Sequence, residues 1–157
     1  MDELILERAQ KQFAETVEDA SFSRAMLVIT IAPTQLVEVT QRLKTEFAFD
    51  LLLDVTAIDW PERTTRFELV YHFYSTMHHV RIRVKTRVPE QDPSVDSLTP
   101  LYGSAHFMER ECHDMYGIVF RGNPDLRPIL LYEGFVGHPL RKDYAKDHEQ
   151  PLVRYRT

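Results

Sequence analysis

The sequence predicts an α+β fold: a two-layer sandwich with helices on one face of a mostly antiparallel sheet, followed by an extended irregular C-terminal arm. Three observations lead to this prediction. Helical and strand-like periodicities follow one another in the order helix, strand, helix and then several strands, which is typical of α+β domains. Residues 79–88 alternate between apolar and basic side chains. Beyond Phe120 the periodicity stops, although apolar residues continue.

The N-terminal part of the chain begins with a predicted helix over residues 2–20. Residues 25–32 are apolar and β-branched and end at Pro33, which predicts a buried strand. Pro33 and Thr34 then provide the start of a second helix, which should end near Phe49. Each helix shows the apolar stripe of an amphipathic helix. The stripes consist of Ile5, Ala9, Phe13 and Val17 in the first helix and of Leu36, Val39, Leu43 and Phe47 in the second.

Three further strands are predicted at residues 51–59, 67–74 and 79–88. The last strand has one apolar side, which should face the core, and one basic side, which should face water or a partner. Residues 75–78 join the last two strands and indicate an antiparallel hairpin. The apolar side comprises Val80, Ile82, Val84 and Thr86, and the basic side comprises Arg81, Arg83, Lys85 and Arg87.

A third helix is predicted from Leu101 to Met115, after a polar loop that contains prolines. Gly103 weakens the start of this helix, and Gly117 is placed to act as a left-handed cap at its end. Cys112 lies on the apolar face, so we expect its thiol to be packed in the core. That face consists of Leu101, Ala105, Met108, Cys112 and Met115.

The domain organisation follows from length and from the change of composition near Phe120. A chain of 157 residues fits one ordinary domain, expected here over residues 1–120. Residues 121–157 are expected to form an extended partner-binding arm and not an independent domain. Gly and Pro are too frequent there for long helices, yet the apolar content is too high for a solvated linker. A simple C-terminal wrap around the domain is the alternative.

Composition and charge exclude several classes of protein. The chain is 43% hydrophobic and 27% charged, close to the average of globular proteins. No apolar run reaches the roughly 18 to 20 residues that a membrane helix requires, so membrane association is expected only through a partner. The N-terminus does not resemble a secretory signal, and a cytosolic compartment is expected. A net charge of −5 with dispersed basic residues argues against nucleic acid as the main ligand.

Catalytic chemistry has little support in the sequence. It contains no glycine-rich phosphate loop, dinucleotide fingerprint or nucleophile elbow. Cys112 is the only cysteine, so this chain alone cannot form a disulfide or a four-thiolate zinc or iron–sulfur site. Cys112 is followed by His113 and Asp114. Successive residues on a helix diverge by about 100°, so these three side chains cannot converge as a nucleophilic site.

A metal site on the third helix is the remaining hypothesis that would give this chain chemistry of its own. His106, Glu109 and His113 share one ridge of the helix. The two histidines lie about 10 Å apart along the axis, whereas zinc ligands must approach the ion to about 2.1 Å. We therefore expect a polar helix face at this position, and no catalytic, cofactor-binding or metal-binding residues in the chain.

The segment ERECHDMYGIVFRGNPDLRPILLYEGFVGHPLRKDY, residues 109–144, resembles the signature of the thirty-kilodalton (C) subunit of complex I. The family pattern begins with Glu-Arg-Glu at residues 109–111, followed by Asp114. It continues with Gly-x-Pro-Asp-Leu-Arg at residues 122–127 and with Gly-Phe-x-Gly-His-Pro-Leu-Arg-Lys-Asp at residues 134–143. A weaker likeness begins at residues 55–59. Asn123 and Pro128 depart from the family pattern, which usually has His and a basic residue there.

The resemblance implies a cofactor-free structural subunit in the peripheral arm of proton-translocating NADH:quinone oxidoreductase. Such a subunit packs on the large hydrogenase-like subunit of the quinone site, with iron–sulfur subunits nearby. FMN and the iron–sulfur clusters are then held by partner subunits. The implied location is the cytoplasmic side of the bacterial inner membrane, or the matrix side in mitochondria. Two alternatives stay open: an equivalent subunit of a membrane-bound hydrogenase or photosynthetic NDH-type complex, and a self-sufficient enzyme or metal protein using residues 106–114.

The expected partner interface is formed by the third helix and the arm. Arg141 is expected to present its guanidinium to a carboxylate or carbonyl of the partner. The alternative is an internal ion pair with Glu109 or Glu111. The interface residues expected from the sequence are Glu109, Arg110, Glu111, Asp114, Arg127, Tyr132, Phe135, His138, Arg141, Lys142 and Asp143.

Overall fold

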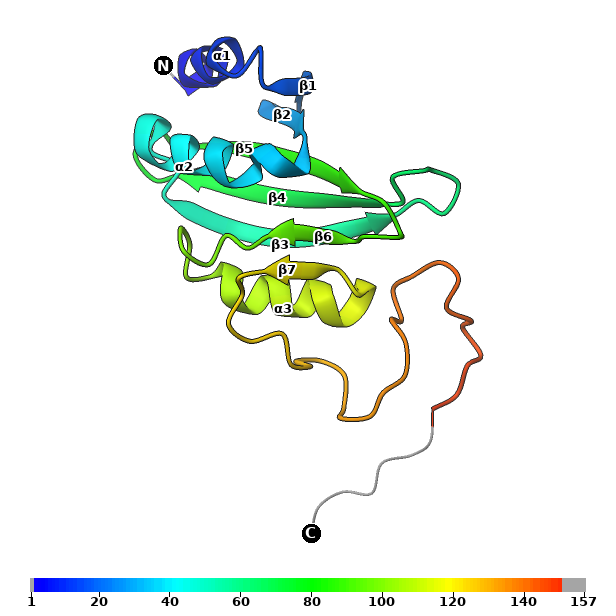
Figure 1. The fold of residues 1–157 in the computed structure, drawn as a ribbon. Coiled ribbons are helices and arrows are strands. Elements are labelled where there is room, and N and C mark those ends of the chain that lie inside the picture. Colours follow the sequence, from blue (N-terminus) through cyan, green and yellow to red (C-terminus); the bar gives the residue numbers. More distant parts are fainter. Residues whose placement is uncertain (1, 151–157) are drawn as a thin grey trace.

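The computed structural model describes residues 2–150, with side chains from residue 4 onward. Its helices are α1 (Asp2–Gln12), α2 (Leu36–Phe47) and α3 (Ala105–Tyr116), with a 3-10 turn, η1 (Pro33–Gln35), before α2. Its strands are β1 (Val17–Ser23), β2 (Met26–Ile31), β3 (Leu51–Asp59), β4 (Phe67–Ser75), β5 (Val80–Val88), β6 (Ser94–Asp96) and β7 (Val119–Arg121). The helices pack on one face of the main sheet (Figure 1), and the predicted two-layer α+β class is confirmed.

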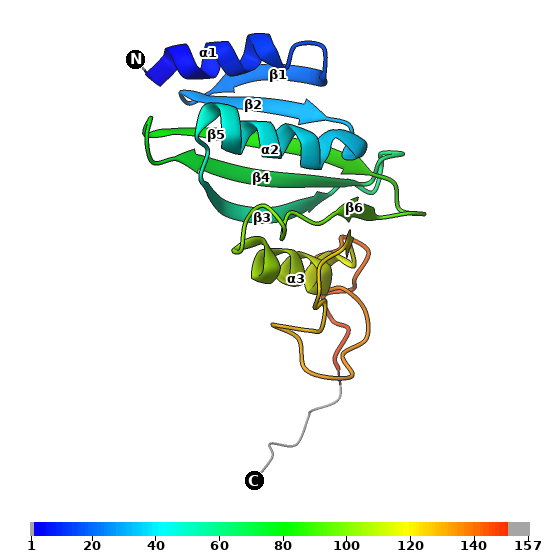
Figure 2. The same cartoon turned by 60° about the vertical axis from the view of Figure 1, so that its left-hand side comes forward.

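The main sheet has the strand order β1-β2-β5-β4-β3. Its strand pairs are antiparallel except for β2 and β5, which run parallel with Leu27 opposite Ile82. Figure 2 shows α2 lying across this sheet and α3 beside β3. One contiguous core fills the space between the sheet and the helices. It includes the fully buried side chains of Phe13, Leu27, Ile29, Leu43, Phe47, Phe73 and Ile82.

The predicted helix over residues 2–20 is wrong in its second half. The helix ends at Gln12, and residues 17–23 form the edge strand β1, paired with β2. The amides of Thr16 and Val17 both donate to the carbonyl of Phe13 and turn the chain out of the helix. Val17 therefore belongs to a strand, where its backbone pairs with Ile31. An edge strand with mostly exposed side chains lacks the strong apolar alternation that identifies a strand in sequence.

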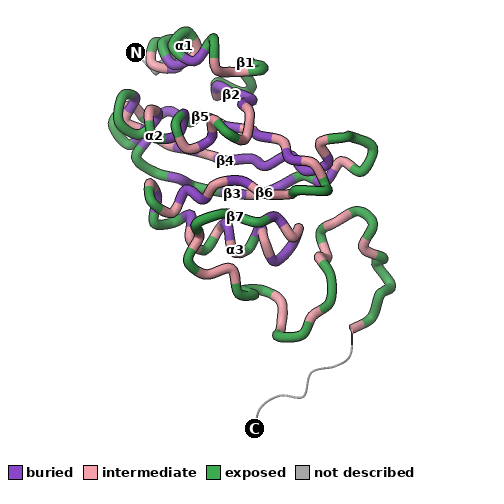
Figure 3. Tube along the Cα trace, viewed as in Figure 1, coloured by how far each residue is buried: buried purple, intermediate pink, exposed green. Residues whose placement is uncertain are grey.

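The other predicted helices and strands are confirmed to within a few residues at their ends. Ala48 closes α2 with a left-handed backbone, φ 54°, and Gly117 closes α3 in the same way, φ 75°. The β4–β5 pair is the expected hairpin. In β5 the apolar residues are buried and the basic residues are exposed or half-buried (Figure 3). The short parallel pair of β6 and β7 was not predicted.

The arm follows β7, and residues 122–150 contain no helix or strand. It passes along α3, reaches the C-terminal end of that helix and then lies near the end of β3 (Figure 1). Residues 151–157 of the expected arm lie outside the described residues. No helix in the described part of the chain is long and apolar enough to cross a membrane.

Candidate functional site

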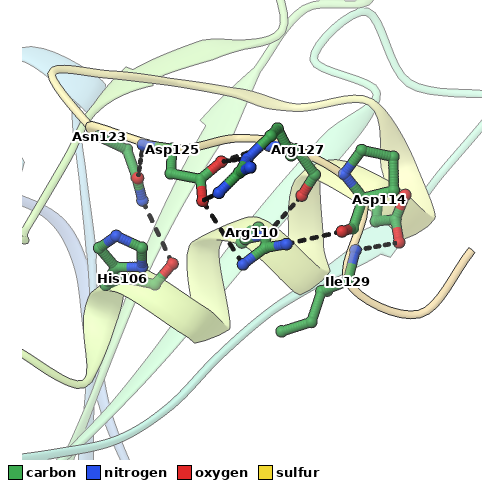
Figure 4. A network of polar contacts seen from close by, with 8 residues as sticks. His106, Arg110, Asp114, Asn123, Asp125, Arg127 and Ile129 are labelled. Carbon is green, nitrogen blue, oxygen red and sulfur yellow. Dashed lines mark hydrogen bonds and ion pairs between the residues drawn. The ribbon is translucent and has the colours of Figure 1, made fainter. Parts of the chain in front are cut away.

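One side of α3 holds the first part of the arm. His106, Arg110 and Asp114 recur at four-residue steps, so they lie on the same side of the helix. Figure 4 shows the arm running along these three residues. The side-chain amide of Asn123 donates to the carbonyl of His106 at 3.5 Å. The guanidinium of Arg110 donates to the carbonyls of Arg127 and Pro128, two residues of the arm.

Asp114 makes the densest contact between α3 and the arm. Its carboxylate oxygen Oδ2 accepts hydrogen bonds from three consecutive backbone amides, those of Ile129, Leu130 and Leu131, at 3.1, 2.9 and 2.9 Å. The Asp114 residue is 6% exposed. Hydrogen bonds from amides to a carboxylate are among the stronger ones in proteins. The sequence places an acid at this position on the inner side of α3, and the arm backbone folds around it.

A second carboxylate, Asp125, organises the same part of the arm. It accepts hydrogen bonds from the amide and the guanidinium of Arg127, and its Oδ2 lies 3.6 Å from the Arg110 guanidinium. The hydrogen bonds from Arg127 lower the pKa of Asp125 well below its ordinary value. The Arg127 side chain is 82% exposed, so it remains accessible to a partner.

The C-terminal end of α3 is capped by the arm. The last carbonyls of a helix have no partner within the helix and need other donors. Here His138 Nδ1 lies 2.9 Å from the carbonyl of Asp114, the amide of Leu140 donates to the carbonyl of Met115, and Arg141 Nε donates to that of Tyr116 at 2.6 Å. A cation at this end also interacts favourably with the helix dipole.

This cap requires a glycine at position 117. A Cβ at Gly117 would lie 2.5 Å from His138 Nε2 and 2.7 Å from Arg141 Nη2. The backbone of Gly117 is also left-handed, and its amide donates to the carbonyl of His113 at 2.7 Å. The absence of a side chain therefore serves both the helix end and the close approach of the arm.

A buried ion pair fixes the arm beyond the cap. Arg66 is 5% exposed and donates to both oxygens of Asp59, at 2.7 and 2.9 Å, so that the ends of β3 and β4 are joined. It also pairs with Asp143 of the arm at 2.9 Å and with Glu90 at 2.6 Å. The amide of Lys142 donates to Asp59. The hydrogen bonds from Arg66 lower the pKa of both aspartates.

Glu109 lies in the core, and the expectation of a polar helix face is wrong at this residue. It is fully buried and accepts hydrogen bonds from Ser97 Oγ at 2.6 Å, from the amide of Leu98 at 2.7 Å and from Asn123 Nδ2 at 2.9 Å. Burial raises the pKa of its carboxyl, against the effect of these hydrogen bonds. Glu109 thus joins α3 to the loop before it and to the first residues of the arm.

Cys112, His113 and Asp114 point to different surroundings. Cys112 is 2% exposed in the core, and burial raises the pKa of its thiol. His113 Nδ1 lies 2.8 Å from the carbonyl of Ile118. Among the described residues no group of three or more His, Cys, Asp or Glu side chains is placed to hold a metal ion. Arg141 pairs with neither Glu109 nor Glu111; its guanidinium instead also lies over the ring of Phe67, 5.0 Å from the centroid.

The outer side of the arm is apolar and exposed. The backbone amides of residues 129–131 and of Leu140 donate to α3. In contrast, the side chains of Leu130, Val136 and Leu140 are 63%, 69% and 50% exposed. A hollow of about 400 Å³ lies between the arm and the end of α3. Its lining includes Leu126, Leu131, Tyr132, Phe135 and His138.

The residues expected at a partner interface divide into three groups. Glu109, Arg110, Asp114, His138, Arg141 and Asp143 contact other parts of this chain, as described above. Tyr132 and Phe135 form a ring pair with centroids 5.4 Å apart, and Phe135 also stacks on Tyr144 at 6.0 Å. Glu111, Arg127 and Lys142 are exposed. Sequence reasoning did not single out Arg66 or the exposed Leu130 and Val136, because charge or apolar character alone does not reveal which side of an irregular arm a residue occupies.

Comparison with known proteins identifies the fold. The trypsin-resistant fragment (1-134) of Nqo5 superposes with a TM-score of 0.69 at 31% identity, covering 80% of this chain and 100% of the fragment. A chain of the membrane-bound sulfane sulfur reductase, an archaeal respiratory membrane complex, superposes with a TM-score of 0.80 at 26% identity, covering 92% and 85%. The fold is therefore one found in subunits of respiratory complexes.

Similarity in sequence identifies the family. Residues 29–150 match the family of the 30 Kd subunit of respiratory-chain NADH dehydrogenase, and the chain belongs to this family. The corresponding NADH-quinone oxidoreductase subunit from Citrifermentans bemidjiense is 40% identical over 137 residues, 87% of this chain and 85% of the relative. The mitochondrial NADH dehydrogenase [ubiquinone] iron-sulfur protein 3 of Candida albicans is 46% identical over 130 residues, 82% of this chain and 46% of the relative.

The words "iron-sulfur protein" in the name of the Candida relative require a test against the residues of this chain. A cluster is held by several thiolates or by thiolates with histidines. This chain has one cysteine, and Cys112 is enclosed in the apolar core. The residues present do not fit a cluster held by this chain.

Proposed function

We propose that this chain is a non-catalytic, cofactor-free subunit of the peripheral arm of proton-translocating NADH:quinone oxidoreductase. In this proposal it packs on the large hydrogenase-like subunit that helps to form the quinone site, beside the iron–sulfur subunits. NADH oxidation, FMN and the iron–sulfur clusters belong to those partners. The chain stays on the cytoplasmic side of the bacterial membrane, or on the matrix side in mitochondria, and reaches the membrane only through the complex. Family membership supports the assignment to this complex.

One observation carries the proposed role: the arm is held in place by α3 while three of its apolar side chains, those of Leu130, Val136 and Leu140, are exposed. An irregular segment that is already fixed loses little conformational freedom when it binds, so more of its contact energy contributes to affinity. Exposed apolar residues on such a segment are typical of a protein interface. The arm is therefore the docking surface of this proposal, with Leu130, Val136 and Leu140 as its contacts.

The test of the docking surface is the double substitution Leu130→Ser/Val136→Ser in the complete complex. Full burial of each side chain contributes about 1.5–3 kcal/mol, so we expect the yield of assembled complex to fall at least tenfold. The melting temperature of the isolated chain should stay within about 1 °C, because both side chains are exposed. The matched control is Leu4→Ser/Phe22→Ser, whose side chains are 71% and 48% exposed on α1 and β1. Normal assembly of the arm variant would refute the docking surface.

The cofactor-free role has a separate test. Purified chain should be colourless and should contain no stoichiometric iron, whereas the complex isolated through a tag on this chain should contain iron–sulfur clusters and oxidise NADH. Stoichiometric iron in the isolated chain would contradict the proposal.

The second candidate is an equivalent small subunit of a related membrane complex with another donor or acceptor, such as a membrane-bound hydrogenase or a photosynthetic NDH-type complex. The similarity to a chain of the archaeal sulfane sulfur reductase favours it. Identification of the subunits that co-purify with the tagged chain, together with NADH–quinone activity of that preparation, distinguishes the two candidates. If the co-purified complex did not oxidise NADH, the second candidate, a subunit of a related membrane complex, would be supported.

A further inference from the structure

Two turns with unusual backbone lie side by side at one end of the sheet. Arg24 and Ala25 connect β1 to β2 with φ 51° and 60°, and His79 precedes β5 with φ 55°. Because β2 and β5 are parallel neighbours, the two turns meet at the same end of the sheet. Non-glycine residues in this conformation are uncommon and often occur at functional sites. The arm is fixed at the opposite ends of β3 and β4, by Asp59 and Arg66, so this region is separate from it.

The two turns enclose an open hollow of about 650 Å³. Its apolar lining is formed by Leu6, Met26 and Val80. The polar lining consists of Arg24, Tyr74, His79 and Arg81. The hydroxyl of Tyr74 lies 3.2 Å from His79 Nδ1, so these two side chains support one another.

The cations of this hollow have no acidic partner. Within residues 4–150, the side chains that the structure describes, no carboxylate lies within 4.0 Å of the guanidinium of Arg24 or Arg81. Both residues are exposed. Arg81 lies over the ring of Tyr74, with its guanidinium carbon 5.9 Å from the centroid. The hollow thus combines an apolar floor with two unneutralised positive charges.

The positive charge continues along β5, on the face of the sheet opposite the helices. Arg83, Lys85 and Arg87 follow Arg81 at two-residue steps, which are about 6.6–6.8 Å in a strand. Glu68 accepts hydrogen bonds from Lys85 at 2.9 Å and from Arg87 at 3.1 Å. Arg83 donates to His72 Nε2, which is a neutral acceptor in this contact. The cations outnumber the carboxylates along this strand, although the whole chain carries a net charge of −5.

We propose that this surface, the turn hollow together with the basic side of β5, binds an extended acidic segment of a neighbouring protein subunit. An extended chain repeats its side chains at the same interval as β5, so alternate acidic residues can face successive cations. The hollow at the end of the strand accepts an apolar side chain of the segment beside Arg24 and Arg81. Asp19 on β1 and Asp54 on β3 lie two strands away from β5 on either side, so the positive charge is confined to a narrow stripe along β5. The inference rests on the proposed function in one respect: this chain must be part of an assembly that contains another protein subunit.

The first test measures binding to the full-length chain by fluorescence anisotropy. The probe is a labelled twelve-residue peptide of alternating Glu and Val. We expect the Kd of the double variant Arg24→Gln/Arg81→Gln to rise at least tenfold at constant ionic strength. The control Lys11→Gln/Lys146→Gln removes the same charge from exposed lysines outside this surface and should change the Kd less than twofold. Equal Kd values for both variants, or no binding by the unaltered chain, would overturn the proposal.

Two further measurements separate the segment from a simple anion. The peptide with Gln in place of Glu should not bind, and inorganic phosphate at matched ionic strength should not displace the acidic peptide. Displacement by phosphate would mean an anion site and would overturn the docking surface.

In the purified complex, a photo-crosslinking phenylalanine analogue placed at Tyr74 should capture an acid-rich segment of another subunit. Failure of the proposed function would instead appear as normal assembly of the Leu130→Ser/Val136→Ser variant, with peptide binding unchanged.

Discussion

The guanidinium of Arg141 donates to the main-chain carbonyl of Tyr116, at the point where α3 ends. This contact ties the arm to the helix from which it departs, and it turns inward a side chain that the sequence suggested would reach a partner. The neighbouring contacts of His138 and Leu140 satisfy the two preceding carbonyls. The Gly-His-Pro-Leu-Arg step of the family pattern therefore acts, in this chain, as the cap of a helix.

The first prediction concerns Arg141. Arg141→Ala should destabilise the isolated chain by about 1–3 kcal/mol, because it removes a charged hydrogen bond to a helix end. For a chain of this size, each kcal/mol lowers the melting temperature by about 2–4 °C. Arg127→Ala is the control on the same arm, since that side chain is 82% exposed and its loss should cost less than about 1 kcal/mol. If Arg141→Ala left the melting temperature of the isolated chain unchanged but prevented assembly, the result would contradict this prediction and support the contact of Arg141 with a partner.

The case of Arg141 illustrates what the sequence could and could not predict. Periodicity reports which face of a helix or strand is buried, so β3, β4 and β5 were predicted with nearly correct ends, and α3 was predicted with its start four residues too early. The arm has no periodicity, and its fixed conformation depends on backbone amides and carbonyls that every sequence contains. Residue type therefore indicated that the arm was important but not which charged side chains turn inward. For the same reason Glu109, a carboxylate on an otherwise polar ridge, gave no sign that it is fully buried.

The second prediction separates backbone strain from crowding at Gly117. Gly117→Ala and Gly122→Ala both force a side chain into a left-handed backbone, with φ 75° and 89°, at a cost of about 1 kcal/mol each. Only at Gly117 would the new Cβ also meet His138 and Arg141, since nothing lies within 4 Å at Gly122. We expect the Leu140 amide, which donates to the carbonyl of Met115, to exchange at least tenfold faster in Gly117→Ala than in Gly122→Ala. Equal exchange rates in the two variants would mean that the arm does not depend on this close approach.

The third prediction is a pH dependence at Glu109. Burial raises the pKa of this carboxyl in the folded chain, so folding favours its protonated form. The resulting stability is present below the unfolded pKa of about 4.3 and is lost as the pH rises through the higher folded pKa. Glu109→Gln has no such loss, so its melting temperature relative to the unaltered chain should increase between pH 4 and pH 7.

The aspartates paired with Arg66 titrate in the opposite direction and must be separated from Glu109. The pKa values of Asp59 and Asp143 are lowered, so their stabilisation is lost as the pH falls below about 3.9. The unaltered chain and Glu109→Gln both lose this stabilisation, so it cancels in the difference between their melting temperatures. If the melting temperature of Glu109→Gln relative to the unaltered chain stayed constant or decreased from pH 4 to pH 7, a raised pKa at Glu109 would be contradicted.

The last prediction concerns Cys112, the only cysteine of the chain. Its thiol is buried among apolar side chains and its pKa is raised, so we expect negligible reaction with thiol reagents in the native chain and rapid reaction after unfolding. Cys112→Ala should cost about 1 kcal/mol through lost packing. Cys112→Ser should destabilise the chain more, because the serine hydroxyl would be buried in an apolar environment without a hydrogen-bond partner. In the complete complex neither variant should change the electron paramagnetic resonance signals of the iron–sulfur clusters, provided that assembly is normal. Disappearance of one cluster signal in the fully assembled Cys112→Ala complex would show that the thiol is a ligand, and the cofactor-free role proposed for this chain would then be wrong.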